Sequence, residues 1–167
     1  MMKCPQCRHE MVRNTENHRY TESGLSNVVL VGVEVRRCPH CGETMVSIPR
    51  MEELHQTLAM ALIRHTGRLA PSEIRFLRKW LGWSGVDFAK HMGVTPETVS
   101  RWESVENPKP MGGTAERLLR LAVAYGQPID KYSIDMLTEI NDDQASSVHL
   151  LAMKPERAGW APTTLAA

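Results

Sequence analysis

All four cysteines of the chain lie in its first 41 residues, in two pairs of the form Cys-x-x-Cys. The first pair is Cys4 and Cys7, and the second is Cys38 and Cys41. In each pair a tight turn would point both thiolates at one metal ion, and two such turns complete a tetrahedral shell. Pro5, Pro39 and Gly42 favour the bent backbone that these turns need. Because four thiolates leave no position open for water, the pattern predicts one structural Zn²⁺ per chain.

Two other uses of the cysteines compete with a metal site. Disulfides are typical of secreted proteins, and the N-terminus of this chain does not resemble a signal peptide. A redox-active Cys-x-x-Cys usually lies on the strand-to-helix turn of a βαβ unit, which the sequence does not show. His9 and His40 lie beside the cysteines, but with the shell filled by thiolates we expect them on the surface or behind the ligands.

The segment between the two pairs must form strands that bring the cysteines together. Residues 28–31 and 33–37 are rich in valine and are preceded by Gly24 and separated by Gly32, a pattern typical of strands. Residues 10–20 are a further candidate strand. A segment of about 45 residues cannot build a sufficient core alone, so the metal would substitute for one.

A helix that connects two domains is predicted from Ser47, its capping residue, to Gly67. Its apolar residues recur at helical spacing, at Met51, Leu54, Leu58 and Leu62. Residues 1–66 are therefore expected to be a small zinc-ribbon β domain with a connecting helix, and residues 67–70 a linker.

Residues 71–140 are predicted to form an all-α domain of four to five helices, which makes the fold class mixed. The expected helices cover residues 72–81, 85–92, 96–103, 113–125 and 127–140. Ser84 and Asp87 form a capping box at the second helix, and Thr95-Pro96 supplies a cap and a first-turn proline to the third. Residues 141–167 are polar and are expected to be a flexible tail.

The second and third of these helices are joined only by Gly93-Val94, which forces a steep crossing typical of a helix-turn-helix. In that motif the N-terminal part of the second helix faces the base edges of DNA. Arg101 could pair with guanine, and Glu97 could accept from cytosine or only cap the helix. The full set of candidate DNA contacts is Thr95, Glu97, Thr98, Ser100, Arg101, Ser84, Arg75, Arg78 and Lys79, the last three of which could equally form a solvated face.

The formal net charge of +1 conceals an uneven distribution along the chain. Residues 64–131 carry eleven basic and seven acidic side chains, a net charge of +4, whereas residues 132–167 carry two and five, a net charge of −3. The middle segment would therefore attract nucleic acid. No apolar run reaches the roughly 20 residues of a membrane span, and we expect a cytoplasmic protein that does not bind a membrane.

The run from Phe88 to Glu103, preceded by the segment Leu77 to Gly82, resembles the Cro/repressor class of helix-turn-helix proteins. One departure is Gly85, because that class usually has a phosphate-binding Gln there. Joined to an N-terminal Cys₄ domain, this motif resembles the MqsA-type antitoxins and the related YgiT-type zinc-finger regulators over residues 1–126.

This resemblance implies a homodimer, formed through the helix-turn-helix half, that binds a palindromic operator in its own promoter and represses it. It also implies a zinc half that binds a cognate ribonuclease toxin. Arg101 matches a base-contacting arginine of the family, whereas its base-contacting Asn corresponds to Glu97, so the operator sequence is expected to differ. A stand-alone regulator without a toxin, or a zinc-ribbon protein-interaction module, is the alternative. We do not expect an enzyme, because the sequence shows no phosphate loop, His-Glu-x-x-His motif or Ser/His/Asp signature.

Overall fold

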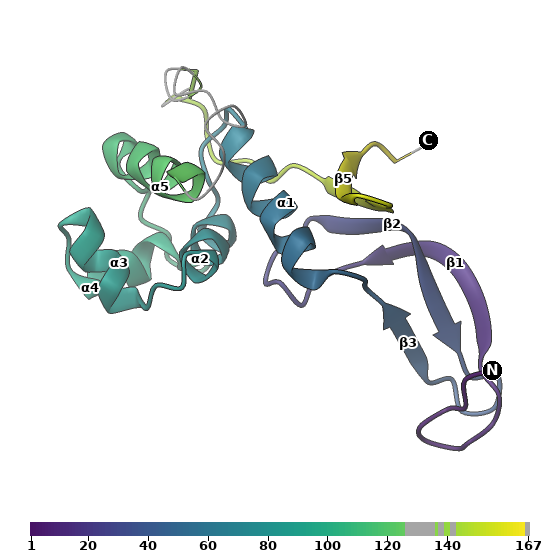
Figure 1. The fold of residues 1–167 in the computed structure, drawn as a ribbon. Helices are drawn as coiled ribbons and strands as arrows, with labels where there is room; N and C mark the ends of the chain where they lie inside the picture. The colour runs from purple at the N-terminus through teal and green to yellow at the C-terminus, as the bar shows by residue number, and fades with distance from the viewer. Residues whose placement is uncertain (126–135, 137–138, 141–142, 166–167) are drawn as a thin grey trace.

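The computed structural model describes residues 1–125, 136, 139–140 and 143–165 of the chain. Figure 1 shows strands at one end of the molecule, helix α1 across its middle, and four further helices at the other end. The mixed fold predicted from the sequence, with strands around the cysteines followed by helices, is therefore confirmed.

Three antiparallel strands form the N-terminal arm of the molecule, which ends at the cysteines. Strand β1 (Val12–Arg19) pairs with β2 (Val28–Arg37), and β2 pairs with β3 (Thr44–Ser47). Most side chains of β1 are exposed, and at the end of the arm that carries the cysteines the buried residues are Cys4, Met11 and Cys38. The arm therefore has little apolar core of its own to hold its distal end.

Strand β2 runs continuously through Gly32, where the sequence predicted a break between two strands. The buried side chains alternate on either side of this glycine, at Val28 and Leu30 and then at Val33 and Val35, with a shift of one residue between the two sets. Gly32 has a φ of +67°, and its N–H donates to Asn17 Oδ1 over 3.2 Å, where the register of β1 is irregular. A bulge thus keeps the valines on one face, because glycine adopts the left-handed backbone at low cost.

Helix α1 (Met51–Arg64) buries Leu54, Leu58 and Leu62 of its predicted apolar stripe, whereas Met51 at the first position is 40% exposed. The helix begins after Arg50, whose φ of 49° turns the chain, whereas the predicted capping residue Ser47 lies in β3. The Arg50 guanidinium donates to the carbonyl oxygens of Glu156 and Gly159. The start of α1 is therefore fixed by contacts with the C-terminal part of the chain.

The C-terminal segment, predicted from its composition to be a flexible tail, contains two strands that complete the sheet. Strand β4 (Leu151–Glu156) pairs in parallel with the first residues of β2, and β5 (Gly159–Thr163) pairs antiparallel with β4. Trp160 is buried against α1, and its Nε1 donates to Pro49 O over 2.7 Å. This parallel pairing joins residues far apart in sequence, so no local pattern could reveal it.

The helical half contains four helices within one residue of their predicted limits. They are α2 (Pro71–Trp80), α3 (Gly85–Met92), α4 (Pro96–Trp102) and α5 (Gly113–Tyr125). Residues 127–140, predicted as one more helix, lie largely outside the described residues. Leu118 and Leu121 continue the apolar helical spacing of α5, but they are 43% and 41% exposed, because α5 packs on α1 and α2 through Leu119 and Val123 instead.

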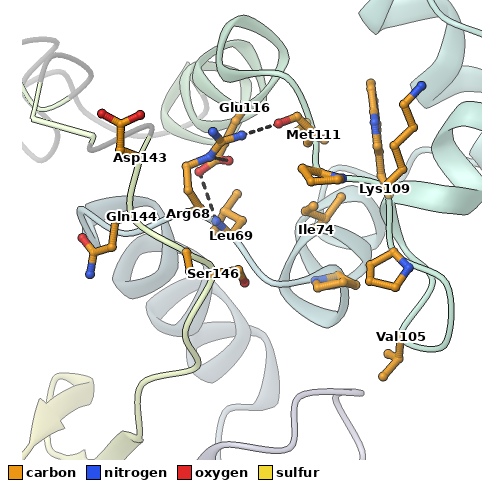
Figure 2. Close-up of a pocket in the computed structure, with 15 residues that line it drawn as sticks. Arg68, Leu69, Ile74, Val105, Lys109, Met111, Glu116, Asp143, Gln144 and Ser146 are labelled. Carbon is orange, nitrogen blue, oxygen red and sulfur yellow. Dashed lines mark hydrogen bonds and ion pairs between the residues drawn. The ribbon is translucent and has the colours of Figure 1, made fainter.

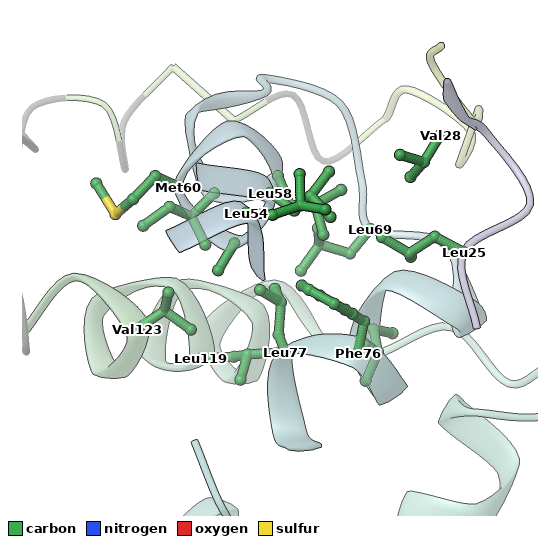
Figure 3. Close-up of a cluster of buried hydrophobic side chains, with 14 of the residues drawn as sticks. Leu25, Val28, Leu54, Leu58, Met60, Leu69, Phe76, Leu77, Leu119 and Val123 are labelled. Atoms are coloured by element: carbon green, nitrogen blue, oxygen red, sulfur yellow. The ribbon is translucent and has the colours of Figure 1, made fainter. Parts of the chain in front are cut away.

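A continuous hydrophobic core joins the sheet to the helices, with α1 as the shared wall (Figure 3). Leu25 and Val28 approach α1 from the sheet side, while Leu77 and Leu119 approach it from α2 and α5. The Tyr20 hydroxyl also lies 2.9 Å from His55 Nε2 on α1. One hydrophobic core thus contains residues from before and after the predicted linker 67–70.

The predicted linker is held by a buried cluster of charged side chains from α5. Arg120, which is fully buried, donates to the carbonyl oxygens of Ile63 at the end of α1 (3.1 Å) and of Gly67 (2.6 Å). Glu116 accepts from Arg120 over 2.7 Å, from the Leu69 backbone N–H over 3.1 Å, and from the Arg68 guanidinium over 2.6 Å. Arg120 thus satisfies carbonyl groups that the last turn of α1 leaves without intrahelical partners.

Replacing Arg120 with Met should destabilise the protein by about 3–5 kcal/mol, because Glu116 would keep a buried charge with one partner fewer. Urea denaturation followed by circular dichroism measures this change. The control is Lys154→Met, on an exposed side chain of β4, which should alter the free energy of unfolding by less than about 0.5 kcal/mol. Equal stability of the two variants would contradict the role given to Arg120.

Glu73 at the start of α2 makes stability depend on pH. Its side chain is 5% exposed and accepts from the Ala70 N–H over 2.8 Å, and burial raises the pKa of this carboxyl from 4.5 to about 7. Between pH 4.5 and 7 the unfolded state loses the proton while the folded state keeps it, so the stability that this carboxyl contributes falls as pH rises.

Glu73→Gln keeps the acceptor but cannot ionise. As pH rises from 4.5 to 7, the free energy of unfolding of this variant minus that of wild type should increase by about 3 kcal/mol. Outside that window the difference should change little. Denaturation curves across this range, with the exposed Glu52→Gln as control, measure the effect. A difference between Glu73→Gln and wild type that stays constant with pH would contradict it.

Candidate functional site

The two Cys-x-x-Cys pairs form turns of the same geometry at the end of the arm. In the first turn the Arg8 N–H donates to Cys4 O over 2.9 Å, and in the second the Gly42 N–H donates to Cys38 O over 3.0 Å. The residue after each pair is left-handed, with φ of 62° at Arg8 and 78° at Gly42. The glycine at position 42 indicates a left-handed backbone in the sequence, whereas an arginine in the equivalent position gives no such indication.

The four thiols converge at one point. Cys7 Sγ lies 3.3 Å from Cys38 Sγ and 3.4 Å from Cys41 Sγ, and Cys4 Sγ lies 3.5 Å from Cys41 Sγ. A tetrahedral shell with metal–sulfur bonds of about 2.3 Å has edges of about 3.8 Å, whereas a disulfide is about 2.05 Å long. All four cysteines are free in this structure, and the four residues could hold a metal ion.

Local backbone groups favour the metal-binding form of one thiol in particular. Hydrogen bonds from the backbone of Cys41, and also of His40, lower the pKa of Cys38 from 9.0 to about 6, although burial acts in the opposite direction. A thiolate, not a thiol, coordinates a metal ion. Cys38 is thus prepared for coordination by the turn that carries it.

His9 and His40, expected near the cysteines but outside the shell, are stacked on each other with ring centroids 3.9 Å apart. Both side chains are exposed, and His9 Nδ1 lies 3.1 Å from Cys7 O. The rings link the two turns directly across the site. Nitrogen atoms of these rings also lie within 4.8 Å of Cys7 Sγ, so they form a second, more exposed set of possible ligands.

At the other end of the molecule, α3, a short turn and α4 present a helical surface. The turn contains Gly93 with a φ of 65°, and Ser84 and Asp87 exchange the two hydrogen bonds of a capping box at the start of α3. At α4, Thr95 Oγ1 accepts from the Thr98 N–H over 3.3 Å, as the sequence predicted. These caps fix where each helix begins and therefore which side of α4 faces outward.

Helix α4 is anchored from behind by its own apolar residues and by a buried carboxylate. Val99 and Trp102 are buried, and the Trp102 ring packs edge-on against Phe88. Glu103, 5% exposed, receives hydrogen bonds from Arg78 over 2.5 and 2.9 Å and from Arg75 over 3.4 Å. The sequence reasoning missed Glu103, although the two arginines three positions apart on α2 were an available signal for a buried acidic partner.

The sequence-predicted DNA contacts fall into two groups in the structure. Thr95, Glu97, Ser100 and Arg101 are exposed together on α4, Thr98 is half-buried, and Ser84 and Lys79 are exposed on neighbouring elements. Arg78 is instead engaged with Glu103 and with Trp83 O, and its side chain is only 14% exposed. Arg78 therefore holds α4 in place, and the same partner holds the more exposed Arg75.

The Glu97 carboxylate caps the helix that carries it. Its own backbone N–H and the side chain of Thr95 hydrogen-bond to it and lower its pKa from the usual value of 4.5. The charge also lies at the positive end of the α4 dipole. This environment matches the capping interpretation of Glu97 more closely than a contact with cytosine.

A comparison with known protein families matches residues 2–124 to the family described as the antitoxin component of a bacterial toxin-antitoxin system, MqsA. The chain belongs to the MqsA family of antitoxins. No curated protein matches the chain. Membership of the MqsA family supports the prediction of an antitoxin and favours a regulatory protein over an enzyme.

The match to the MqsA family includes both cysteine pairs and all but the last residue of α5, and it ends before β4 and β5. The C-terminal hairpin is thus an addition of this chain to the matched range. Within the described residues, no helix has the length and apolar character needed to cross a bilayer.

The cysteine site should hold one metal ion per chain, which elemental analysis of the purified protein measures. Cys38→Ser should lose the ion, because it removes a buried ligand, and should melt at a lower temperature. His40→Ala should retain the full amount, since the four thiolates complete the shell without it. Loss of metal from His40→Ala but not from Cys38→Ser would instead identify the set Cys7, His9 and His40 as the ligands.

Proposed function

We propose that the chain is the antitoxin of a type II toxin-antitoxin pair and represses its own promoter by binding operator DNA through α4. The observation that carries this proposal is the outward face of α4, where Ser100 and Arg101 are exposed on a helix anchored by Val99 and Trp102. A rigid helix with free polar side chains is what the major groove of DNA accepts.

Arg101 is the residue most suited to read a base. Its guanidinium makes no hydrogen bond or ion pair with any described residue, so its five donors are available for the two acceptors of guanine. Ser100 lies beside it, and the exposed side chains of Lys79 and Ser84 would contact phosphates. Because Gly85 offers no side chain, the phosphate contact at α3 falls to Ser84 and to the backbone N–H groups of its first turn.

Zinc is the metal that the cysteine site favours. Four thiolates in a tetrahedral arrangement suit Zn²⁺, whereas Mg²⁺ and Ca²⁺ prefer oxygen ligands. With Cys4 and Cys38 buried and no position open for substrate, the ion acts as a structural element of the arm.

The second copy of the chain in a homodimer would cover the outer face of α5. Leu118 and Tyr125 are 43% and 91% exposed and, with Leu81 and Met92, line a shallow cavity of about 360 Å³, and Leu121 on the same helix is 41% exposed. Single exposed apolar residues are common on protein surfaces, whereas a contiguous apolar patch of this kind is typical of an interface. A dimer related by a two-fold axis would present two copies of α4 to half-sites about one helical turn apart in a palindromic operator.

A cognate ribonuclease toxin would bind the arm. Met2 and Met45 are exposed on the arm, and the adjoining groove is lined by Met1, Met2 and Met11 together with the basic residues Lys3, Arg13 and Arg36. Because this surface lies at the opposite end from α4, toxin and DNA could bind the same chain together (Figure 1).

Arg101→Ala should weaken binding to DNA from the chain's own promoter by about 1–3 kcal/mol and relax the preference for the bound sequence. Lys79→Ala should weaken binding to all sequences alike and reduce the slope of log affinity against log salt by about one. Electrophoretic mobility shifts measure both effects, with Lys154→Ala as the control. Operator binding by Arg101→Ala at wild-type strength would refute the proposed role of α4.

Met45→Lys should lose inhibition of the toxin encoded beside the chain while still binding the operator, because it replaces an exposed apolar side chain beside this groove with a further positive charge. Arg101→Ala should show the reverse behaviour. Ribonuclease assays with the purified toxin, run beside mobility shifts, separate the two activities. If the neighbouring gene product is neither bound nor inhibited by wild type, the chain is a stand-alone regulator and only the DNA part of the proposal stands.

A further inference from the structure

A cavity of about 460 Å³ lies behind α4, on the side away from its exposed face (Figure 2). Its walls come from the linker, the start of α2, the loop after α4 and residues 143–146. The volume falls within the range of natural small-molecule sites. Residues 143–146 lie beyond the range matched to the MqsA family, so the C-terminal addition supplies one wall of this cavity.

Most of the cavity surface cannot hydrogen-bond. Ile74, Trp102, Val105 and Met111 contribute apolar side chains, and three prolines contribute backbone without N–H donors. The charged pair of Arg68 and Glu116 lies at one wall, where the two side chains neutralise each other and Arg68 also donates to Met111 O (Figure 2). A ligand for this space must therefore be largely apolar.

One cation at the cavity is available to a ligand. The Lys109 side chain is exposed, and it makes no hydrogen bond or ion pair with the residues that the structure describes. In Figure 2 Lys109 and Val105 lie on one side of the cavity, whereas Asp143 and Ser146 lie on the other. An anionic group beside Lys109 would thus be separated from the negative charge of Asp143.

We propose that this cavity binds a small apolar carboxylate, with its hydrocarbon part between Ile74 and Val105 and its carboxylate at Lys109. The Lys109 N–H donates to Arg101 O over 3.1 Å, which ties the loop that would contact the ligand to the last turn of α4. Occupancy of the cavity would therefore be transmitted to the helix proposed to read DNA. The site itself does not require DNA binding.

Decanoate, a ten-carbon carboxylate, is a suitable probe below its micelle concentration. Titration calorimetry of the full chain should show one site per chain. Lys109→Gln should weaken binding about tenfold, the effect of losing one charge-assisted contact, whereas Lys109→Arg should stay within about threefold of wild type. Decan-1-ol, which has the same chain without the charge, should bind wild type about as weakly as decanoate binds Lys109→Gln.

The position of the site is tested by Ala145→Trp, which fills the cavity from an exposed residue and leaves the apolar core unchanged. This variant should bind no decanoate while keeping the circular dichroism spectrum and melting temperature of wild type, and the control Lys154→Gln should bind as wild type does. If wild type binds no decanoate at a concentration of about 1 mM, which corresponds to a weak dissociation constant, the proposal is overturned. Unchanged binding by Ala145→Trp or by Lys109→Gln overturns it as well.

Discussion

The structure depends on one buried contact, the donation of Arg120 to the carbonyl oxygens where α1 ends and the linker begins. A fully buried guanidinium is costly unless charge and hydrogen bonds are matched, and Glu116 on the same helix face supplies the compensating charge. The pair fixes α5 against α1, and α1 in turn packs on the sheet. The arm with the cysteines and the surface of α4 are therefore held in one orientation by Arg120, Glu116 and α1, which lie between them.

The end of the arm that carries the cysteines is stabilised in a different way from the centre of the molecule. The distal part of β1 is exposed on both faces, so burial of apolar surface contributes little there, and four thiolates around one ion would close the end of the arm instead. The chain thus combines a region held by an extended core with a region that metal coordination would hold. This division explains why the cysteines lie at the tip rather than within the shared core.

Local chemistry made much of this fold predictable from sequence. The Cys-x-x-Cys turns, the Ser84 box and the Thr95 cap depend on residues within a few positions of each other, and the structure places each as expected. The features that sequence reasoning missed depend on distant partners: β4 pairs with β2, and Arg78 turns to Glu103 instead of solvent. Exposed Leu118 and Leu121 mimic a core stripe, because a helical pattern cannot distinguish an intramolecular face from one that a second copy would cover.

The central claim is that the outward face of α4 enters the DNA groove, and cross-linking from that face tests it most directly. A photoreactive amino acid in place of Ser100 should cross-link to bases in two half-sites about one helical turn apart, whereas the same group in place of Thr15 on β1 should not reach DNA. Cross-links from position 15 with none from position 100 would show that the arm, not α4, lies on the nucleic acid.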